Sequence, residues 1–192
     1  MSSRNIHLSQ TQFGDEEAKA CAEVLRSGNL REGRKTKDFE DAFRLHAGVK
    51  HAIATSSGTS ALHLVYQALL QPGDEVIVPA FTFIATASMV AMTGAKPVFC
   101  DVDPDTWVMD PADVERKITS KTRAIAGVHL FGNSCDIARI QKIATQKKIK
   151  LIWDAAQSLG TRYQSRDVAE TADAVCFSFY PSKNMTTGEG GM

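Results

Sequence analysis

The chain has 192 residues, of which 43% are hydrophobic and 23% are charged. This composition is typical of a soluble globular protein that can bury a core within one domain. The 22 basic and 22 acidic residues give a formal net charge of zero, so the charge balance favours neither nucleic acid nor a membrane surface as a partner. No apolar run approaches the ~20 residues that would span a bilayer.

The cysteines and histidines point to a reduced protein without a metal. Cys21, Cys100, Cys135 and Cys176 are widely spaced and form no C-x-x-C pair, so we expect free thiols, with Cys100 and Cys176 in the core. The first residues contain no apolar segment of the kind found in secretory signals. These features predict a cytoplasmic protein. The five histidines show no metal-ligand spacing, and no metal is predicted.

Helix and strand patterns alternate along the chain. Helices are predicted over residues 16–26, 36–47, 59–70, 84–92, 111–118 and 137–147. Short apolar runs typical of strands buried on both faces cover residues 51–55, 75–79, 97–101, 123–129, 150–154 and 174–179. Gly28 and Gly48 end the first two helices, and Asp110-Pro111 begins the fifth. The alternation predicts an α/β fold with a mostly parallel sheet and flanking helices.

Lys183 is the most informative residue for function. It follows the last predicted strand and precedes the glycine-rich segment 188–191. Ligands of parallel sheets bind beyond the C-terminal ends of the strands, and a lysine there can form a Schiff base with an aldehyde cofactor. A surface lysine after a buried strand is the simpler alternative.

Asp154 ends the predicted strand 150–154. A carboxylate at the end of a buried strand is costly unless it has a partner. The protonated ring nitrogen of a pyridine cofactor would be such a partner. Capping of the following turn is an equally good explanation of this aspartate.

Three further segments could complete a cofactor site. Residues 55–60 join a strand to a helix, and their small side chains together with the helix N-terminus could admit a phosphate. Phe83 could stack on a cofactor ring, although core packing is the more common role of phenylalanine. Ser178 could donate a hydrogen bond to a phosphate or to the local backbone.

Together these segments resemble the DegT/StrS-type sugar aminotransferase family of fold type I pyridoxal-phosphate enzymes. The resemblance runs in the family's order from about Gly28 to the last residue. The matching stretches are residues 54–62, 73–79, 94–99, 128–132, 154–157 and 177–184.

The resemblance implies pyridoxal 5′-phosphate as the cofactor and Lys183 and Asp154 as catalytic residues. Lys183 would hold the cofactor covalently and move protons, and Asp154 would pair with the pyridine nitrogen. The implied cofactor-binding residues are Ser57, Gly58, Thr59 and Ser60 together with Ser178 at the phosphate, Phe83 at the ring, and Gln157 near the phenolic oxygen. Lys183 also argues against the dehydratase branch of the family, in which a histidine replaces this lysine.

The implied function is amino transfer from an amino acid, expected to be glutamate, to a nucleotide-linked keto sugar, in a homodimer. Another pyridoxal-phosphate reaction on a nucleotide sugar, or an inactive truncated fragment, are the alternatives. Family members continue past Met192 through another sheet strand and a C-terminal domain. We therefore expect an N-terminal helical segment over residues 1–48 and a partial cofactor-binding large domain over residues 49–192, without the C-terminal domain.

The strand that follows the glycine-rich segment in this family lies between the predicted strands 51–55 and 174–179. A sheet that lacks it has two unpaired edges in its middle. Residues 1–192 alone are therefore expected to be poorly soluble and inactive.

Overall fold

The computed structural model describes residue 6 and residues 9–192. Its centre is a five-stranded sheet in the order β2-β1-β3-β4-β7, in which every neighbouring pair is parallel. The strands are β1 (Glu75–Pro79), β2 (Lys96–Cys100), β3 (Thr122–Val128), β4 (Lys150–Asp154) and β7 (Ala174–Cys176). The predicted α/β fold with a mostly parallel sheet is confirmed.

Within residue 6 and residues 9–192, six α-helices accompany the sheet at the predicted places. They are α1 (Asp15–Ser27), α2 (Arg34–His46), α3 (Gly58–Leu69), α4 (Ala85–Met92), α5 (Pro111–Lys117) and α6 (Ile137–Lys147). Gly28 and Gly48 adopt the left-handed backbone, with φ of 69° and 67°, after the first two helices. The Asp110 carboxylate accepts a hydrogen bond of 2.8 Å from the Ala112 amide at the start of α5. The predicted helix ends thus have their expected local causes.

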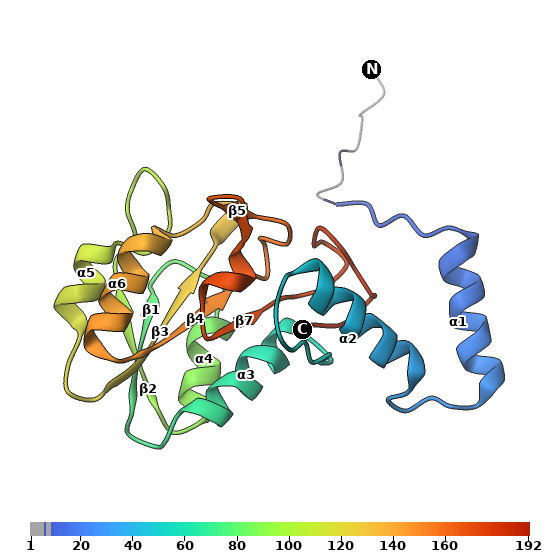
Figure 1. Cartoon of the computed structure of the whole chain (residues 1–192), viewed down its shortest axis with the longest axis horizontal. Coiled ribbons are helices and arrows are strands. Elements are labelled where there is room, and N and C mark those ends of the chain that lie inside the picture. Colours follow the sequence, from blue (N-terminus) through green and yellow to red (C-terminus); the bar gives the residue numbers. More distant parts are fainter. Residues whose placement is uncertain (1–5, 7–8) are drawn as a thin grey trace.

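The three central strands β1, β3 and β4 bury side chains on both faces of the sheet. Ile77 packs with residues of α5 and α6, whereas its neighbours Val76 and Val78 pack with residues of α3 and α4. Trp153 and Ile152 alternate in the same way on β4. Helices α3 and α4 lie on one side of the sheet, and helices α5 and α6 lie on the other (Figure 1). This two-sided burial explains why the strands appear in the sequence as unbroken apolar runs.

The prediction of a strand over residues 51–55 is wrong, because only Thr55 in this segment forms a β-bridge. Gly191 lies between Thr55 and Ser178 and makes antiparallel bridges to both. The amides of Thr55 and Gly191 each donate to the other's carbonyl at 2.9 Å. Within the described residues, the segment 51–55 has a neighbouring backbone only at Thr55. A ladder of strand hydrogen bonds therefore cannot extend along the segment.

The last strand is also shorter than predicted. It ends at Cys176, and residues 177–179 turn instead to pair with residues 190–192. The Phe177 amide donates to the Met192 carbonyl at 2.9 Å, and the Phe179 amide donates to the Gly190 carbonyl at 2.9 Å. The glycine-rich segment therefore returns the chain to the sheet beside β7.

The two N-terminal helices differ in how they join this body. Phe43 on α2 packs edge-to-face on Phe177 and Phe179, with ring centroids 5.1 and 5.6 Å apart. Within the described part of the chain, α1 buries none of its side chains and stands away from the sheet (Figure 1). An ion pair of 3.4 Å between Glu23 and Lys35 connects α1 to α2.

A small hairpin was not predicted from the sequence. Strands β5 (Arg162–Tyr163) and β6 (Arg166–Asp167) pair antiparallel. The turn between them places Gln164 and Ser165 at φ of 49° and 68°. Two-residue strands give no measurable alternation, and the turn lacks the Asn-Gly or Asp-Gly pair that usually marks such a hairpin.

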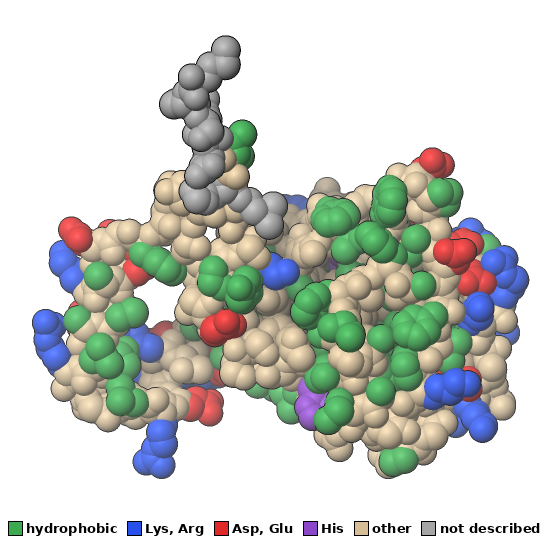
Figure 2. All heavy atoms as spheres, turned by 180° about the vertical axis from the view of Figure 1, so that it is seen from behind, with side chains coloured by type: hydrophobic (Ala, Val, Ile, Leu, Met, Phe, Trp, Pro, Cys, Tyr) green, Lys and Arg blue, Asp and Glu red, His purple; other side chains and the backbone are tan. Residues whose placement is uncertain are grey.

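The surface shows no extended basic area on the face drawn in Figure 2, where hydrophobic side chains gather over the α/β body and charged ones lie mainly around α1 and α2 and at the opposite edge. Among the residues that the structure describes, no helix is both long and apolar enough to cross a membrane. Cys100, Cys135 and Cys176 are buried free thiols, while Cys21 is an exposed one. The expected core positions of Cys100 and Cys176 are confirmed.

A groove of about 610 Å³ lies between the segment around residues 47–55 and β7. Apolar residues make up most of its lining, including Ile53, Val175 and Met192. Unpaired strand edges beside apolar surface are templates for pairing with another chain.

We predict that residues 1–192, expressed alone, self-associate through this groove. Ile53→Lys should reduce the association without lowering the thermal midpoint, because Ile53 is 59% exposed and lines the groove. Leu45→Lys is the matched control, since Leu45 is 70% exposed on α2. Light scattering measures the mass of each variant. A wild-type chain that stays monomeric at high concentration, or equal effects of both substitutions, would contradict the prediction.

Candidate active site

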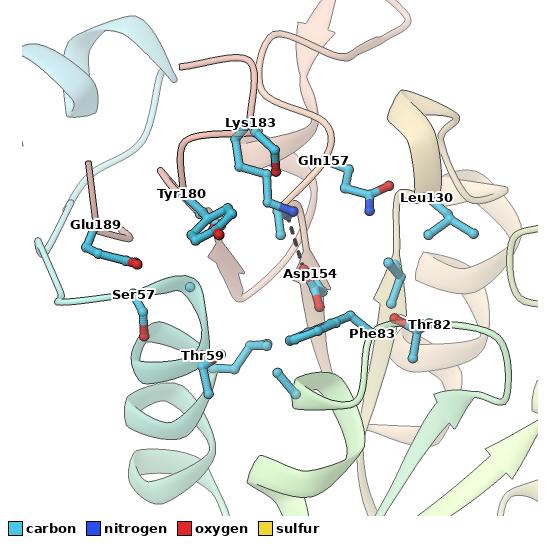
Figure 3. Close-up of a pocket in the computed structure, with 17 residues that line it drawn as sticks. Ser57, Thr59, Thr82, Phe83, Leu130, Asp154, Gln157, Tyr180, Lys183 and Glu189 are labelled. Atoms are coloured by element: carbon cyan, nitrogen blue, oxygen red, sulfur yellow. Dashed lines mark hydrogen bonds between the residues drawn. The ribbon is translucent and has the colours of Figure 1, made fainter. Parts of the chain in front are cut away.

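A cavity of about 500 Å³ opens at the C-terminal ends of β3 and β4, beside the N-terminus of α3 (Figure 3). This is the end of a parallel sheet at which ligands usually bind. Of the sequence-predicted site residues, those that line the cavity are Ser57, Gly58, Thr59, Phe83, Asp154, Gln157, Ser178 and Lys183.

Asp154 lies at the inner end of this cavity and is only 4% exposed. Its Oδ2 accepts a hydrogen bond of 2.7 Å from the Thr86 hydroxyl, and its Oδ1 accepts one of 3.1 Å from the Ala156 amide. Burial raises the pKa of this carboxyl, and the bonds from Thr86 and Ala156 and the charge of Lys183 oppose the rise. The carboxylate thus keeps accepting capacity that faces the cavity.

Asp154 in turn affects its buried neighbours. Burial, and secondarily the Asp154 charge, raise the pKa of the Tyr66 hydroxyl on α3 and of the Cys176 thiol on β7. Both groups are therefore neutral at ordinary pH. The charged side chain that acts on Asp154 is Lys183.

The N-terminus of α3 forms the opposite end of the cavity. Ser57 caps the helix, and its Oγ accepts a hydrogen bond of 3.0 Å from the Ser60 amide. That bond occupies the Ser60 amide, and Ser60 is the predicted site residue that lies outside the cavity lining. The first-turn amides of Gly58 and Thr59 have no intrahelical acceptor, and both residues line the cavity. Such amides, with the helix dipole, bind anions.

Gly58 allows this helix end to approach the strand that carries Ser178. A Cβ at position 58 would lie 2.8 Å from the Ser178 Cβ and 3.3 Å from the Phe177 carbonyl oxygen. Real Cβ atoms do not come so close, so any larger residue would push α3 away from Ser178. The close packing brings the Ser178 hydroxyl beside the helix amides.

Lys183 is half-buried and lies in the turn after residues 177–179, where its amide donates to the Tyr180 carbonyl at 2.9 Å. Its side chain lines the same cavity as Asp154 (Figure 3). The lysine and the aspartate, 29 positions apart in the printed sequence, thus line one cavity.

Gln157 and Phe83 form the outer part of the lining. The Gln157 Oε1 accepts a hydrogen bond of 2.9 Å from the Phe131 amide, which leaves the side-chain NH₂ group to donate. Phe131 holds the left-handed backbone, with φ of 56°. Phe83 is 69% exposed at the rim, so the sequence alternative of core packing for this ring is wrong.

Several lining residues were not singled out by the sequence. Thr82, Tyr180 and Glu189 line the cavity next to residues that were. Thr86, which donates to Asp154, lies 68 positions away from it in the chain. Thr82, Tyr180 and Glu189 could have been suggested only by their nearness in sequence to Phe83 and Lys183. No local sequence pattern marks Thr86.

His129 is buried next to the site but is held by its own contacts. Its Nδ1 accepts a hydrogen bond of 3.1 Å from the Cys135 amide, and its ring lies 4.8 Å from the Trp153 ring. Burial lowers the pKa of His129 to about 4, so the ring is neutral. Across residue 6 and residues 9–192, no group of three or more His, Cys, Asp or Glu residues is placed to hold a metal ion.

The residues present fit a pyridoxal phosphate. A buried carboxylate with free accepting capacity suits a protonated ring nitrogen, the α3 amides with Ser178 suit a phosphate, and Lys183 suits an aldehyde carbon. A parallel α/β sheet with such a site fits the class of pyridoxal-phosphate-dependent proteins. The chain belongs to the DegT/DnrJ/EryC1/StrS aminotransferase family, whose model matches residues 11–192. The family resemblance predicted from the sequence is confirmed.

Relatives in sequence cover most of this chain. Spore coat polysaccharide biosynthesis protein SpsC of Bacillus subtilis is 43% identical over 181 residues, which are 94% of this chain and 46% of SpsC. GDP-perosamine synthase of Caulobacter vibrioides is 47% identical over 161 residues, which are 83% of this chain and 43% of that protein. The chain spans about half the length of the curated relatives it matches.

The fold agrees with solved structures as well. Spr1654 of Streptococcus pneumoniae, described as a sugar aminotransferase, superposes with a TM-score of 0.95 at 35% identity and covers 98% of this chain and 52% of its own. It has been solved in a PLP-form and a PMP-form. The prediction of pyridoxal phosphate as the cofactor is confirmed for the class to which this chain belongs.

The raised pKa of Asp154 predicts how the cofactor-free protein responds to pH. A free aspartate titrates near ~3.9, and burial raises the value in the folded state. The folded state therefore gains stability from this group below pH ~4 and loses it as the pH rises, by up to ~1.4 kcal/mol per pH unit between the two pKa values. Asp154→Asn removes this loss.

We expect the cofactor-free Asp154→Asn variant to exceed the wild type in thermal midpoint at pH 7, with the difference shrinking toward pH 4. Calorimetry across this range measures it. Asp105→Asn, at an exposed position, is the control and should change little. A wild type that is more stable than Asp154→Asn at pH 7 and loses this advantage on acidification would show that the carboxylate serves as a structural cap.

Proposed function

We propose that this chain forms the cofactor-binding part of a pyridoxal-phosphate-dependent aminotransferase. The whole protein transfers an amino group from an amino acid, with glutamate as the expected donor, to a nucleotide-linked keto sugar. Membership of the family and the names of relatives such as GDP-perosamine synthase support this reaction class.

The observation that carries the proposal is the shared cavity of Lys183 and Asp154. One is a primary amine that can bond to an aldehyde. The other is a buried carboxylate whose hydrogen-bond donors, among the residues that the structure describes, are the uncharged Thr86 hydroxyl and Ala156 amide. The bound cofactor supplies a positively charged ring that withdraws electrons from a carbon attached to the amino group. Asp154 keeps the proton on the ring nitrogen, because an ionised carboxylate accepts a hydrogen bond and cannot donate one.

The phosphate lies at the other end of the cavity in this proposal. The Gly58 and Thr59 amides would donate to a phosphate there, Ser57 holds the helix end in place, and the Ser178 hydroxyl would donate from the segment that follows β7. Charge-assisted bonds of this kind are about twice as strong as neutral ones. They keep the cofactor in the site whenever Lys183 is not bonded to it.

The remaining lining residues fix the plane of the ring. Phe83 lies at the rim of the cavity, where it would hold a cofactor ring, and the Gln157 NH₂ group would be the donor for the cofactor's phenolic oxygen. The bond from the Phe131 amide to Gln157 Oε1 sets the amide orientation that this requires. Both residues keep the aldehyde carbon directed at Lys183.

Lys183 has two tasks. Its amine would hold the aldehyde carbon of the cofactor, and as a free amine it would carry a proton at the reacting carbon of the substrate. An amine performs both steps only when it is deprotonated. The resemblance implies that the dehydratase branch of the family carries a histidine at the position of Lys183. The lysine at this position therefore argues against a dehydratase.

Two alternatives remain distinguishable by experiment. A different pyridoxal-phosphate reaction on a nucleotide sugar would use the same binding residues without net amino transfer from glutamate. An inert fragment would bind no cofactor. Absorbance of the bound aldehyde, lost on borohydride reduction, separates the inert fragment from both enzymes, and conversion of glutamate to 2-oxoglutarate separates the two reactions.

We further propose a homodimer of the whole protein. Tyr180 is 51% exposed and, like Phe83, lines the cavity, so a second copy would cover apolar surface at the site. The free thiols support a cytoplasmic location. A division into an N-terminal helical segment, residues 1–48, and the cofactor-binding domain, residues 49–192, remains part of this proposal.

We predict that Lys183→Ala in the intact protein still binds pyridoxal phosphate. Its turnover should fall by roughly two to four orders of magnitude, which is the usual contribution of a positioned acid–base group. The phosphate and ring contacts remain, while the covalent bond and the proton carrier are lost. Lys117→Ala, at an exposed position on α5, is the control. Borohydride reduction followed by peptide mapping should label Lys183 in the wild type and in the control. Near-normal turnover of Lys183→Ala would overturn the assignment.

A further inference from the structure

Two threonine hydroxyls connect the cavity wall to the buried Asp154. Thr86 on α4 is fully buried, and its hydroxyl donates to Asp154 Oδ2 at 2.7 Å. The hydroxyl oxygen of Thr82 lies 3.0 Å from that of Thr86, and Thr82 lines the cavity (Figure 3). The result is a short chain of hydrogen bonds from the cavity to the carboxylate.

The first turn of α4 is held in place independently. The Tyr66 hydroxyl, fully buried on α3, donates to the Thr86 carbonyl at 3.1 Å. Thr86 is therefore fixed both through its backbone and through its side chain. A hydroxyl immobilised in this way loses little entropy when it donates to Asp154.

The chain has a definite direction because a hydroxyl has one proton to donate. An ionised Asp154 can only accept, so the Thr86 proton is directed at it. Thr86 must then accept from Thr82, and Thr82 presents only lone pairs to the cavity. If Asp154 is protonated on Oδ2, the direction reverses and Thr82 presents its proton to the cavity instead. The other titratable groups facing Asp154 are Tyr66, Cys176 and Lys183.

We propose that Thr82 and Thr86 are positioning residues that keep Asp154 ionised and oriented, so that the site takes a ring whose nitrogen carries its proton. This inference rests on the proposed function, since the ring is that of pyridoxal phosphate. In this inference the two threonine hydroxyls take no part in the reaction itself. They maintain the ionised state of Asp154, on which the reaction depends.

The experiment measures the binding of pyridoxal phosphate to the intact protein by absorbance titration between pH 5 and 8.5. Affinity falls on the acidic side as Asp154 takes up a proton. Titration of free pyridoxal phosphate is identical for all variants, so differences between variants report the protein. The quantity compared is the pH midpoint of the acidic fall.

Thr86→Val removes the hydroxyl at nearly constant volume. A hydrogen bond to a charged group is lost, so we expect the midpoint to move upward by about one to two pH units. Thr86→Ser restores the hydroxyl and should restore the midpoint. Thr82→Val should give a smaller upward shift, because Thr86 then loses its own donor.

Thr93→Val is the matched control. Thr93 follows α4, and its hydroxyl donates to the Val90 carbonyl at 2.8 Å, with no bond to Asp154. Its midpoint should equal that of the wild type. If Thr86→Val does not fold, Thr82→Val and Thr86→Ser decide the question.

Equal midpoints for Thr86→Val, Thr82→Val and the wild type would overturn the inference and leave the proposed function standing. A wild type that binds no pyridoxal phosphate would overturn the proposed function itself. A shift in Thr93→Val equal to that in Thr86→Val would assign the effect to α4 packing and also overturn the inference.

Discussion

The structure depends on one constraint, the burial of the Asp154 carboxylate at the C-terminal end of β4. A buried charge without a full set of partners costs free energy, and the two hydrogen bonds from Thr86 and Ala156 offset only part of it. The folded protein therefore carries a group that is better satisfied by a cationic donor in the cavity than by the protein alone. Buried ionisable groups with shifted pKa values are often found at functional sites for this reason.

The sheet delivers the other groups to the same place. Parallel strands all end at one edge, so the segments that follow β3, β4 and β7 meet around a single cavity. Close backbone approach completes the arrangement at two glycines. Gly58 lets α3 reach Ser178, and a Cβ at Gly191 would lie 2.4 Å from the Ser57 carbonyl. The glycine-rich return of the chain thus supports the N-terminus of α3 at the cavity.

Local signals were enough to predict most of the fold. Apolar runs buried on both faces located the five strands of the sheet, and Gly48 and the Asp110-Pro111 pair set helix ends. The segment over residues 51–55 has the same apolar composition, yet a strand also needs a neighbour, which composition does not report. Lys183, Asp154 and Gln157 could be assigned by resemblance because they stand in recognisable stretches. Thr86 could not, because its role arises from contact with Asp154 across 68 positions.

The measurement that tests this account most directly compares two ligands in the intact protein. One is pyridoxal phosphate, and the other is its analogue with a carbon–hydrogen group in place of the ring nitrogen. If Asp154 pairs with a protonated nitrogen, the wild type should bind the analogue at least about tenfold more weakly, the value of a hydrogen bond to a charged group. Asp154→Asn should lose most of this preference. Equal affinity of the wild type for both ligands would contradict the account.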